Sequence, residues 1–305
     1  ITALLHNTIE DSLATYEEIE KLFGAEIAKL VDGVTKISKL ELQSASISQT
    51  ENFRKLILAM SNDIRILLVK LADRVHSMRT LSFVQNEVKR KWLAKETLEI
   101  YAPLASRIGI TKFRDALQNY AFEHLYPSEY AMVMEKLANM PHSQQMIENI
   151  NNDLTKVLCE GGLKIQVFGR EKTPYSIWRK MQQRSITFEQ LSDLMAFRVI
   201  VDDLQSCYQA LGQIHSSYVM IPGRFKDYIS APKANGYQSL HTTLIGPYHQ
   251  KIEAQIRTKT MHEVCELGVA AHWHYKQRDN EDESVSQYDG SQYSWVRNLL
   301  EILEQ

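Results

Sequence analysis

The stretch from Arg224 to His241 carries the side-chain types that a phosphorylated, base-bearing ligand needs. Lysine and arginine suit phosphate groups, and a tyrosine ring such as Tyr237 offers a surface on which a base can stack. Pro232 and an Asn-Gly pair argue against a regular element, so the stretch is predicted to be a loop that presents its side chains. A solvated surface loop whose tyrosines pack back on the core is the alternative. The polar candidates in this stretch are Arg224, Lys226, Lys233, Asn235, Tyr237 and His241.

A second group of polar residues lies on a predicted strand, residues 251–257. Glu253, Gln255 and Arg257 fall on one strand face by the two-residue period, and apolar residues fill the other face. Asp193 begins another predicted strand. Two carboxylates suit Mg²⁺ binding and proton transfer, and the cations around them suit a polyphosphate. Taken singly, Glu253 could simply pair with Arg257 on an exposed edge.

Further cations surround these carboxylates in the sequence. Arg170 and Lys172 are predicted to follow a strand, and Lys180 lies about two turns into the next helix, with Ser176 one turn before it. Arg198 lies on the strand that Asp193 begins. Together these residues favour a polyphosphate site over a set of unrelated surface charges.

The first half of the chain holds a different candidate. His6 and Asn7 are followed one turn later by Glu10 and Asp11 on the same face of a predicted helix, and Asp73 lies in an otherwise apolar run. Histidine and carboxylates on facing helices are what a divalent-metal phosphohydrolase needs, because the metal activates water and the acids hold it or move protons. The spacing alone favours the alternative, a histidine that caps a core and two carboxylates that solvate a helix.

Helices are predicted to position this first group. Apolar periodicity indicates helices over 17–31, 52–60, 64–78 and 92–108, with Pro103 interrupting the last and 44–49 as a polar link. Amphipathic segments over 113–125, 129–140 and 146–158 then predict a helical linker. The first half is therefore expected to be all-α.

Strands alternate with helices after Gly161-Gly162. Short strands are predicted over 164–168, 195–201, 242–245 and 251–257, and helices over 174–184, 203–218 and 259–275. The second half is therefore expected to be an α+β domain with a mixed sheet.

Composition limits the ligand class. The 305 residues carry a net charge of −2, yet residues 161–276 hold fourteen Lys and Arg against nine Asp and Glu. A locally basic region in a near-neutral chain suits an anionic ligand better than a long nucleic-acid track. Three widely spaced cysteines predict reduced thiols and a cytoplasmic location, and no apolar run predicts a membrane anchor. The chain opens without Met and within a predicted helix, so we expect it to be part of a longer protein.

Two sets of motifs resemble the RelA/SpoT homologue family, which makes and degrades guanosine tetra- and pentaphosphate, (p)ppGpp. Ala3-Leu-Leu-His-Asn-Thr-Ile-Glu-Asp11 and Lys70-Leu-Ala-Asp-Arg-Val-His-Ser-Met-Arg79 are similar to its HD hydrolase domain. Gly169 to Lys172, Tyr175 to Lys180, Asp193 to Val199, Arg224 to His241, Glu253 to Thr258 and Ala270 to Lys276 are similar, in order and spacing, to its synthetase domain.

The synthetase resemblance implies a GTP diphosphokinase (GTP pyrophosphokinase) with a nucleotidyltransferase-like fold. Such an enzyme moves the β,γ-pyrophosphate of ATP to the 3′-hydroxyl of GDP or GTP. It implies that Asp193 binds Mg²⁺ and that Glu253 activates the hydroxyl and shares the metal. Side chains expected at ATP are Arg170 and Arg198 around adenine, with Lys172, Ser176, Lys180 and Lys226 near the phosphates. Side chains expected at the acceptor are Tyr237 stacked on guanine, with Lys233, Asn235, His241 and Gln255.

The hydrolase resemblance implies a Mn²⁺ site with His6 and Asp73 as ligands and with Glu10 and Asp11 activating water. Asn7 stands where the family has a metal-ligating Asp, and Ser77 replaces an Asn that touches the nucleotide. An amide is a poorer ligand than a carboxylate, and the family's upstream histidine precedes this chain, so we expect little or no hydrolysis. The basic tetrad Arg224-Phe-Lys-Asp227 is nevertheless typical of family members with both activities.

The resemblance implies four regions: a truncated HD-type hydrolase domain over 1–110, a helical linker over 111–160, a synthetase domain over 161–276, and a polar tail over 277–305. Expected ligands are ATP, GDP or GTP, and (p)ppGpp, with no membrane partner. Ribosomes or other regulators would act only through C-terminal domains outside this chain. A catalytically silent guanine-nucleotide sensor and a hydrolase-dominant enzyme remain alternatives; the second depends on whether Asn7 is natural or introduced.

Overall fold

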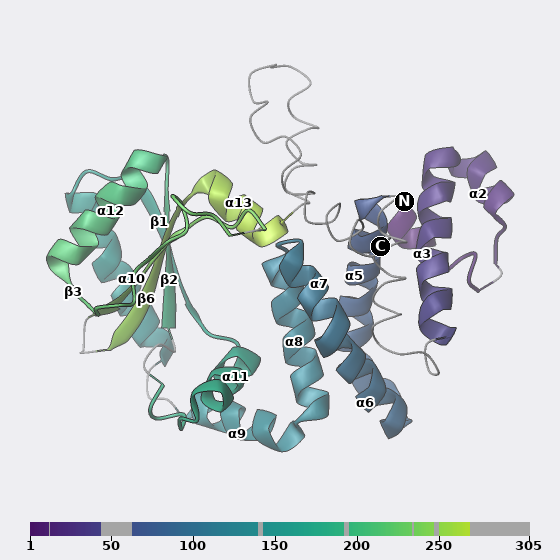
Figure 1. The fold of residues 1–305 in the computed structure, drawn as a ribbon, viewed down its shortest axis with the longest axis horizontal. Helices are drawn as coiled ribbons and strands as arrows, with labels where there is room; N and C mark the ends of the chain where they lie inside the picture. The colour runs from purple at the N-terminus through teal and green to yellow at the C-terminus, as the bar shows by residue number, and fades with distance from the viewer. Residues whose placement is uncertain are drawn as a thin grey trace, which may run out of the picture.

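The computed structural model describes residues 1–11, 13–43, 63–139, 143–191, 195–233, 235–246 and 250–268. Within them, a helical part is followed by a part built on a mixed sheet, which confirms the predicted fold class (Figure 1). Among the described helices, none is both long and apolar enough to span a bilayer. The predicted helix over 52–60, the polar link over 44–49 and the segment Ala270 to Lys276 lie outside the described residues.

The helical part begins with α1 (Thr2–Leu5), α2 (Tyr16–Phe23) and α3 (Ala25–Gln43). Thr15 caps α2, because its side chain accepts from the Glu18 amide while the Glu18 carboxylate accepts from the Thr15 amide. Gly24 then ends α2 with a φ of +88°, a conformation that suits glycine. The predicted single helix over 17–31 is therefore wrong, because Gly24 divides it.

The helical core is centred on α5 (Ile64–Arg79) and α8 (Thr111–Leu125). Asp63 caps α5 by accepting from the Arg65 amide. Apolar side chains of α5 such as Leu67 and Leu71 are fully buried against α3 and α8, as the periodicity predicts. The short helix η2 (Leu81–Phe83) leads from α5 to α6 (Glu87–Glu96).

The predicted interruption of the helix near Pro103 is confirmed, and it takes the form of a short π-helical segment. Helix α6 passes into a π-helical segment, η3 (Thr97–Tyr101), before α7 (Ala102–Arg107). Proline has no amide hydrogen and its ring crowds the carbonyl four residues earlier, so a wider helical turn before Pro103 relieves the clash.

The predicted linker helices form, but they belong to two different cores. They are α8, α9 (Pro127–Ala138) and α10 (Ser143–Glu160). Leu117 of α8 is buried among the N-terminal helices, whereas Ile150, Leu154 and Leu158 of α10 are buried against the sheet. Aromatic rings of α8, α9 and α11 (Pro174–Arg184) join the two parts, with Trp178 stacked on Phe122 at 4.9 Å between ring centroids.

The sheet has the strand order β1-β2-β6-β5-β3, with β4 also paired to β5. Strands β2 and β6 are parallel and the other pairs are antiparallel, so the sheet is mixed as predicted. The strands are β1 (Ile165–Glu171), β2 (Met195–Val201), β3 (Val219–Met220), β4 (Lys226–Asp227), β5 (Leu240–Ile245) and β6 (Lys251–Thr258).

Two strand boundaries correct the prediction. Gly169 to Glu171 belong to β1 rather than following it, because they complete the antiparallel pairing with β2. His241 lies on β5 rather than in the loop before it, opposite Gln255 of β6. Both corrections move candidate side chains from loops onto the sheet.

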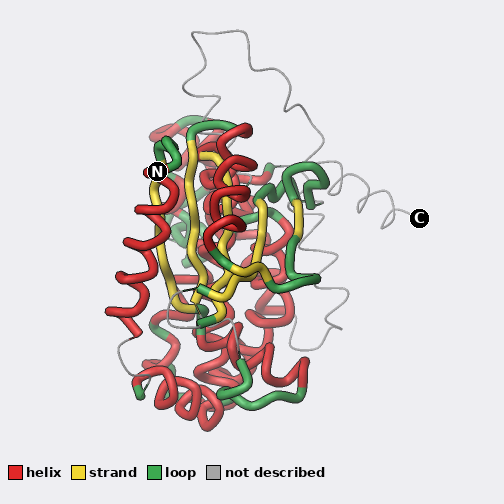
Figure 2. Tube along the Cα trace, turned by 90° about the vertical axis from the view of Figure 1, so that its left-hand side faces the viewer, coloured by secondary structure: helices red, strands yellow, loops and turns green. Residues whose placement is uncertain are grey.

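The sheet is covered on one face. Helices α10 and α12 (Leu204–Ser217) pack on the face that carries Phe197, Val199 and Ile256, and the strands run side by side behind them in Figure 2. The opposite face carries Arg198, Gln255 and His241 in one row across β2, β6 and β5. Helix α13 (Lys259–Leu267) follows β6 directly and lies at the end of the sheet nearest α7 (Figure 1). This polar face is where the chain places most of its candidate chemistry.

Candidate active site

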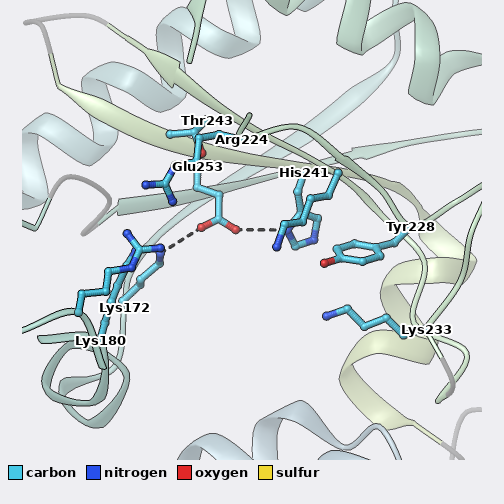
Figure 3. A pocket seen from close by; sticks show the side chains of 10 residues that line it. Lys172, Lys180, Arg224, Tyr228, Lys233, His241, Thr243 and Glu253 are labelled. Carbon is cyan, nitrogen blue, oxygen red and sulfur yellow. Dashed lines mark hydrogen bonds and ion pairs between the residues drawn. The ribbon is translucent and has the colours of Figure 1, made fainter. Parts of the chain in front are cut away.

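Glu253 is the centre of the site on the polar face of the sheet. Its Oε2 lies 3.0 Å from Lys172 Nζ, and its Oε1 lies 3.3 Å from His241 Nδ1 (Figure 3). The same Oε1 accepts from Gln255 Nε2 at 2.9 Å. The carboxylate therefore does not pair with Arg257 on an exposed edge: β6 is an inner strand, and Glu253 is only 19% exposed.

The surroundings of Glu253 favour its ionised form. Burial alone would raise the pKa of this carboxyl, but the hydrogen bond from His241 and the charge of Lys172 hold the pKa well below its ordinary value. His241 donates from Nδ1, because a carboxylate only accepts. In the neutral imidazole its Nε2 then accepts from the Tyr237 hydroxyl at 2.7 Å.

A cavity of about 300 Å³ opens beside Glu253. Among the described residues, six cationic side chains line it and Glu253 is the carboxylate there. The lining cations are Lys172, Lys180, Arg184, Arg224, Lys226 and Lys233. Glu253 and His241 lie between Lys172 and Lys180 on one side and Tyr228 and Lys233 on the other (Figure 3). A polyphosphate would be neutralised here from several elements at once.

A second cavity, of about 290 Å³, adjoins the first and shares Lys233 and His241 with it. Tyr237 lines this cavity, with the Lys233 ammonium 4.7 Å from its ring centroid. Burial raises the pKa of the Tyr237 hydroxyl to about 12, so the group stays protonated. Both cavities are therefore lined by cations and by a tyrosine ring, Tyr228 in the first and Tyr237 in the second, and they meet at Lys233 and His241.

The structure brings most of the predicted nucleotide-binding residues into these two cavities. Lys172, Lys180 and Lys226 line the first, whereas Arg170 and Arg198 share the second with Asn235, Tyr237 and Gln255. Ser176 lies outside both linings and its hydroxyl is 2.8 Å from that of Thr173. The roles of these residues stay predictions.

Three of these residues contact elements outside the sheet. Arg170 Nη1 lies 3.4 Å from Asp115 Oδ2 of α8, and Arg198 Nη1 lies 2.8 Å from Glu266 Oε1 of α13. The Asn235 amide donates to the Ser106 carbonyl of α7 at 3.1 Å. The helical part therefore contributes directly to the wall of the second cavity.

The residues present are compatible with Mg²⁺ at the first cavity. Mg²⁺ is usually held in proteins by one or two carboxylates and by substrate phosphates, and Glu253 faces a cavity suited to phosphates. Asp193, the other predicted ligand, lies outside the described residues.

The candidate metal site of the helical part is sparser. His6 Nε2 lies 3.3 Å from Asp73 Oδ1, as expected for two ligands of one site, but Lys70 Nζ lies 3.4 Å from the other Asp73 oxygen. Among the described residues, no group of three or more His, Cys, Asp and Glu side chains could hold a metal ion. The described donors around His6 are therefore too few to hold Mn²⁺ by themselves.

The structure corrects the prediction that this site lies on one helix face. Helix α1 ends at Leu5, and His6 to Asp11 form turns, with the Asp11 amide donating to the Asn7 carbonyl. The segment from His6 to Asp11 is therefore not a regular helix, although that hydrogen bond keeps Asp11 one α-turn after Asn7.

Sequence reasoning missed several lining residues. Arg184 follows Lys180 by four residues on α11, so helical spacing placed it on the same face. Arg257 was assigned to the polar strand face without a role, although it lines the second cavity. No sequence signal pointed to Ser106 or Asp115, which reach the site from distant helices.

Comparisons with known proteins find matches for both parts of the chain. Residues 169–280 match the region found in RelA/SpoT proteins, and residues 1–111 match the HD domain. The chain is 50% identical over 306 residues to the GTP pyrophosphokinase rsh of Brucella melitensis, covering 99% of this chain and 40% of that protein. It is 48% identical over 303 residues to the bifunctional (p)ppGpp synthase/hydrolase SpoT of Escherichia coli, covering 99% of this chain and 43% of that protein.

The chain thus spans less than half the length of these relatives. Among solved structures, the small alarmone synthetase 1 of Bacillus subtilis bound to its product pppGpp has a TM-score of 0.38 and 21% identity, covering 56% of this chain and 95% of that one.

Proposed function

The chain belongs to the RelA/SpoT homologue family, and on that premise we propose that it is a (p)ppGpp synthetase joined to an impaired hydrolase domain. The synthetase transfers the β,γ-pyrophosphate of ATP to the 3′-hydroxyl of GDP or GTP. The observation that carries this proposal is Glu253, a partly buried carboxylate held between Lys172 and His241 at the edge of a strongly cationic cavity.

The proposed reaction needs positioning and charge neutralisation more than covalent chemistry by the protein. The 3′-oxygen attacks the β-phosphorus of ATP, the bond from that phosphorus to the α,β-bridging oxygen breaks, and AMP leaves. Glu253 accepts the hydroxyl proton. Lys172, Lys180 and Lys226 neutralise the phosphates, and Arg184 and Arg224 add to the same charge.

Residues that line the second cavity are proposed to contact the guanine and adenine bases. Tyr237 stacks on guanine, while Lys233, Asn235, His241 and Gln255 contact the acceptor nucleotide. Arg170 and Arg198 sandwich adenine, which suits the planar guanidinium. Bound Mg²⁺ would be held by Glu253 and Asp193 and would neutralise charge on the transferred phosphates.

Glu253→Gln tests the synthetase. The variant keeps the shape of the side chain but cannot take the proton, so AMP release from ATP with GDP present should fall by about 10²- to 10⁴-fold. Glu189→Gln, on an exposed carboxylate that pairs with Lys136, is the matched control and should retain the wild-type rate. Retained AMP release in Glu253→Gln refutes the role of Glu253. A wild-type chain that binds GDP but releases no AMP would instead be a nucleotide sensor.

The hydrolase is proposed to be impaired because Asn7 supplies an amide where a carboxylate ligand is expected. Mn²⁺-dependent release of pyrophosphate from ppGpp should be close to background in the wild type. Asn7→Asp should raise it if that position is the limiting ligand. Rapid Mn²⁺-dependent release by the unaltered chain would contradict the proposal.

A cytoplasmic location and the four predicted regions, with limits at 110, 160 and 276, also stay predictions.

A further inference from the structure

Arg257 has a buried positive charge that the described residues leave largely uncompensated. Its side chain is fully buried on β6. Its Nη2 donates to the Gln255 amide oxygen at 3.2 Å, while its Nε and Nη1 find no hydrogen-bond acceptor among the residues the structure describes. A buried guanidinium with unused donors costs stability unless a partner arrives.

Arg74 shows what a structural arginine looks like in the same chain. It is almost as buried, with 6% exposure, but its Nε donates to Thr97 and its Nη2 donates to Glu96 at 2.5 Å and to the Leu93 carbonyl at 3.0 Å. The Tyr101 ring lies 4.5 Å from its guanidinium. Arg74 thus has a carboxylate partner, whereas Arg257 has one neutral amide.

Arg257 forms part of the wall of the second cavity. Arg257 lines that cavity together with Tyr237, and its guanidinium carbon lies 5.9 Å from the Tyr237 ring centroid. Arg257 does not line the cationic cavity, where Lys172 and Glu253 lie. Val264 and Cys265 of α13 complete its surroundings in the second cavity. Arg257 therefore lies beside the ring on which the base of the acceptor is proposed to stack.

We propose that Arg257 selects the acceptor by donating to the 6-oxo group of a purine stacked on Tyr237, an inference that rests on the proposed function. Arginine donors pair with the O6 and N7 acceptors of guanine, whereas adenine presents an amino donor at position 6. The two substrates of the proposed reaction are both purine nucleotides that bind side by side. A donor fixed in the acceptor site keeps ADP and ATP from serving as acceptors.

A panel of acceptor diphosphates tests the 6-oxo requirement on the unaltered chain. GDP and IDP both carry the 6-oxo group, and IDP lacks only the 2-amino group. The diphosphate of 2,6-diaminopurine riboside keeps the 2-amino group but has an amino group at position 6. AMP formation with GDP and IDP should exceed that with the diaminopurine nucleotide and with ADP by at least roughly 10-fold. Equal use of GDP and the diaminopurine nucleotide overturns the inference.

Arg257→Gln then assigns the selectivity to this side chain. It should lower kcat/KM for GDP and IDP by roughly 10- to 100-fold, the equivalent of one charge-assisted hydrogen bond, and leave the diaminopurine nucleotide within about threefold. Arg184→Gln, the same substitution in the cationic cavity, should slow every acceptor alike and leave the selectivity intact. Arg257→Lys keeps the charge without the planar donors and should also lose selectivity. An equal loss with all acceptors in both Arg257 variants means a structural role and refutes the proposal.

Equilibrium binding separates this inference from the proposed function. Calorimetric titration with GDP and with the diaminopurine diphosphate gives the preference without turnover. A preference for GDP that disappears in Arg257→Gln supports base selection even if no AMP forms with any acceptor, an outcome that would refute only the synthetase. AMP formation with undiminished selectivity in Arg257→Gln refutes only the role of Arg257.

Discussion

Tyr237 has two separable functions in the structure, and two substitutions should separate them. Its ring lines the second cavity as the proposed guanine platform, and its hydroxyl donates to His241, which in turn lies against Glu253. Tyr237→Phe keeps the ring and removes one neutral hydrogen bond, worth about 1 kcal/mol, or roughly fivefold. Tyr237→Ala also removes the stacking surface, worth about 1–3 kcal/mol per base, or roughly 5- to 150-fold.

The two substitutions should change different binding and kinetic constants. Tyr237→Ala should raise the KM and Kd for GDP, because the ring contacts the bound base. Tyr237→Phe should leave the Kd for GDP nearly unchanged and lower kcat, because the hydroxyl acts through His241 on Glu253. Since burial raises the pKa of Tyr237 to about 12, the hydroxyl stays protonated, and the ratio of Tyr237→Phe to wild-type rates should be constant from about pH 7 to 10.

Steady-state AMP release with varied GDP measures kcat and KM, and calorimetric titration of GDP measures Kd. A Kd for GDP that rises as much in Tyr237→Phe as in Tyr237→Ala would refute the division, because the ring is common to wild type and Phe. An unchanged Kd in Tyr237→Ala would refute the stacking role itself.

Three further predictions concern other parts of the chain. Arg74→Leu should destabilise the fold by about 3–5 kcal/mol in urea unfolding because it leaves the buried Glu96 carboxylate unpaired, and adding Glu96→Leu should recover much of the loss; equal stability of single and double variants would contradict this. Gly268→Ala should lower the Tm, because a Cβ there would collide with the backbone of the α7–α8 turn, and an unchanged Tm would disprove that contact. Cys207 should resist iodoacetamide at pH 8 while the exposed Cys159 reacts, because burial raises the pKa of the Cys207 thiol to about 12; mass spectrometry of the labelled chain decides.

Local periodicity was enough to predict several parts of this molecule. The two-residue period placed Glu253, Gln255 and Arg257 on one strand face, and the strand over 195–201 matches β2 at both ends. Residues on one strand share a face whatever the rest of the chain does, so such patterns survive folding. Gly24 shows where periodicity was insufficient: the apolar stripe continues through it, but its positive φ breaks the helix.

Tertiary structure decided which side chains meet around Glu253. Lys172 is 81 residues away in sequence and reaches Glu253 because β1 and β6 both flank β2. The sequence assigned His241 to a loop, yet strand register places it on β5 opposite Gln255 and against Glu253. A one-residue slip in that register would turn His241 to the other face. The contact between Asn235 and Ser106 spans 129 residues and depends on how α7 packs beside the sheet.

The amino-acid sequence by itself therefore determined the chemical inventory of the site: cations for phosphate, a carboxylate for the hydroxyl, and an aromatic ring for a base. Only the tertiary structure decided how that inventory is divided between two cavities, and that Arg257 keeps two donors without an acceptor among the described residues. The physical reason is that residue type and local period are properties of short segments, whereas burial and pairing depend on strand order, register and the helices that pack beside them.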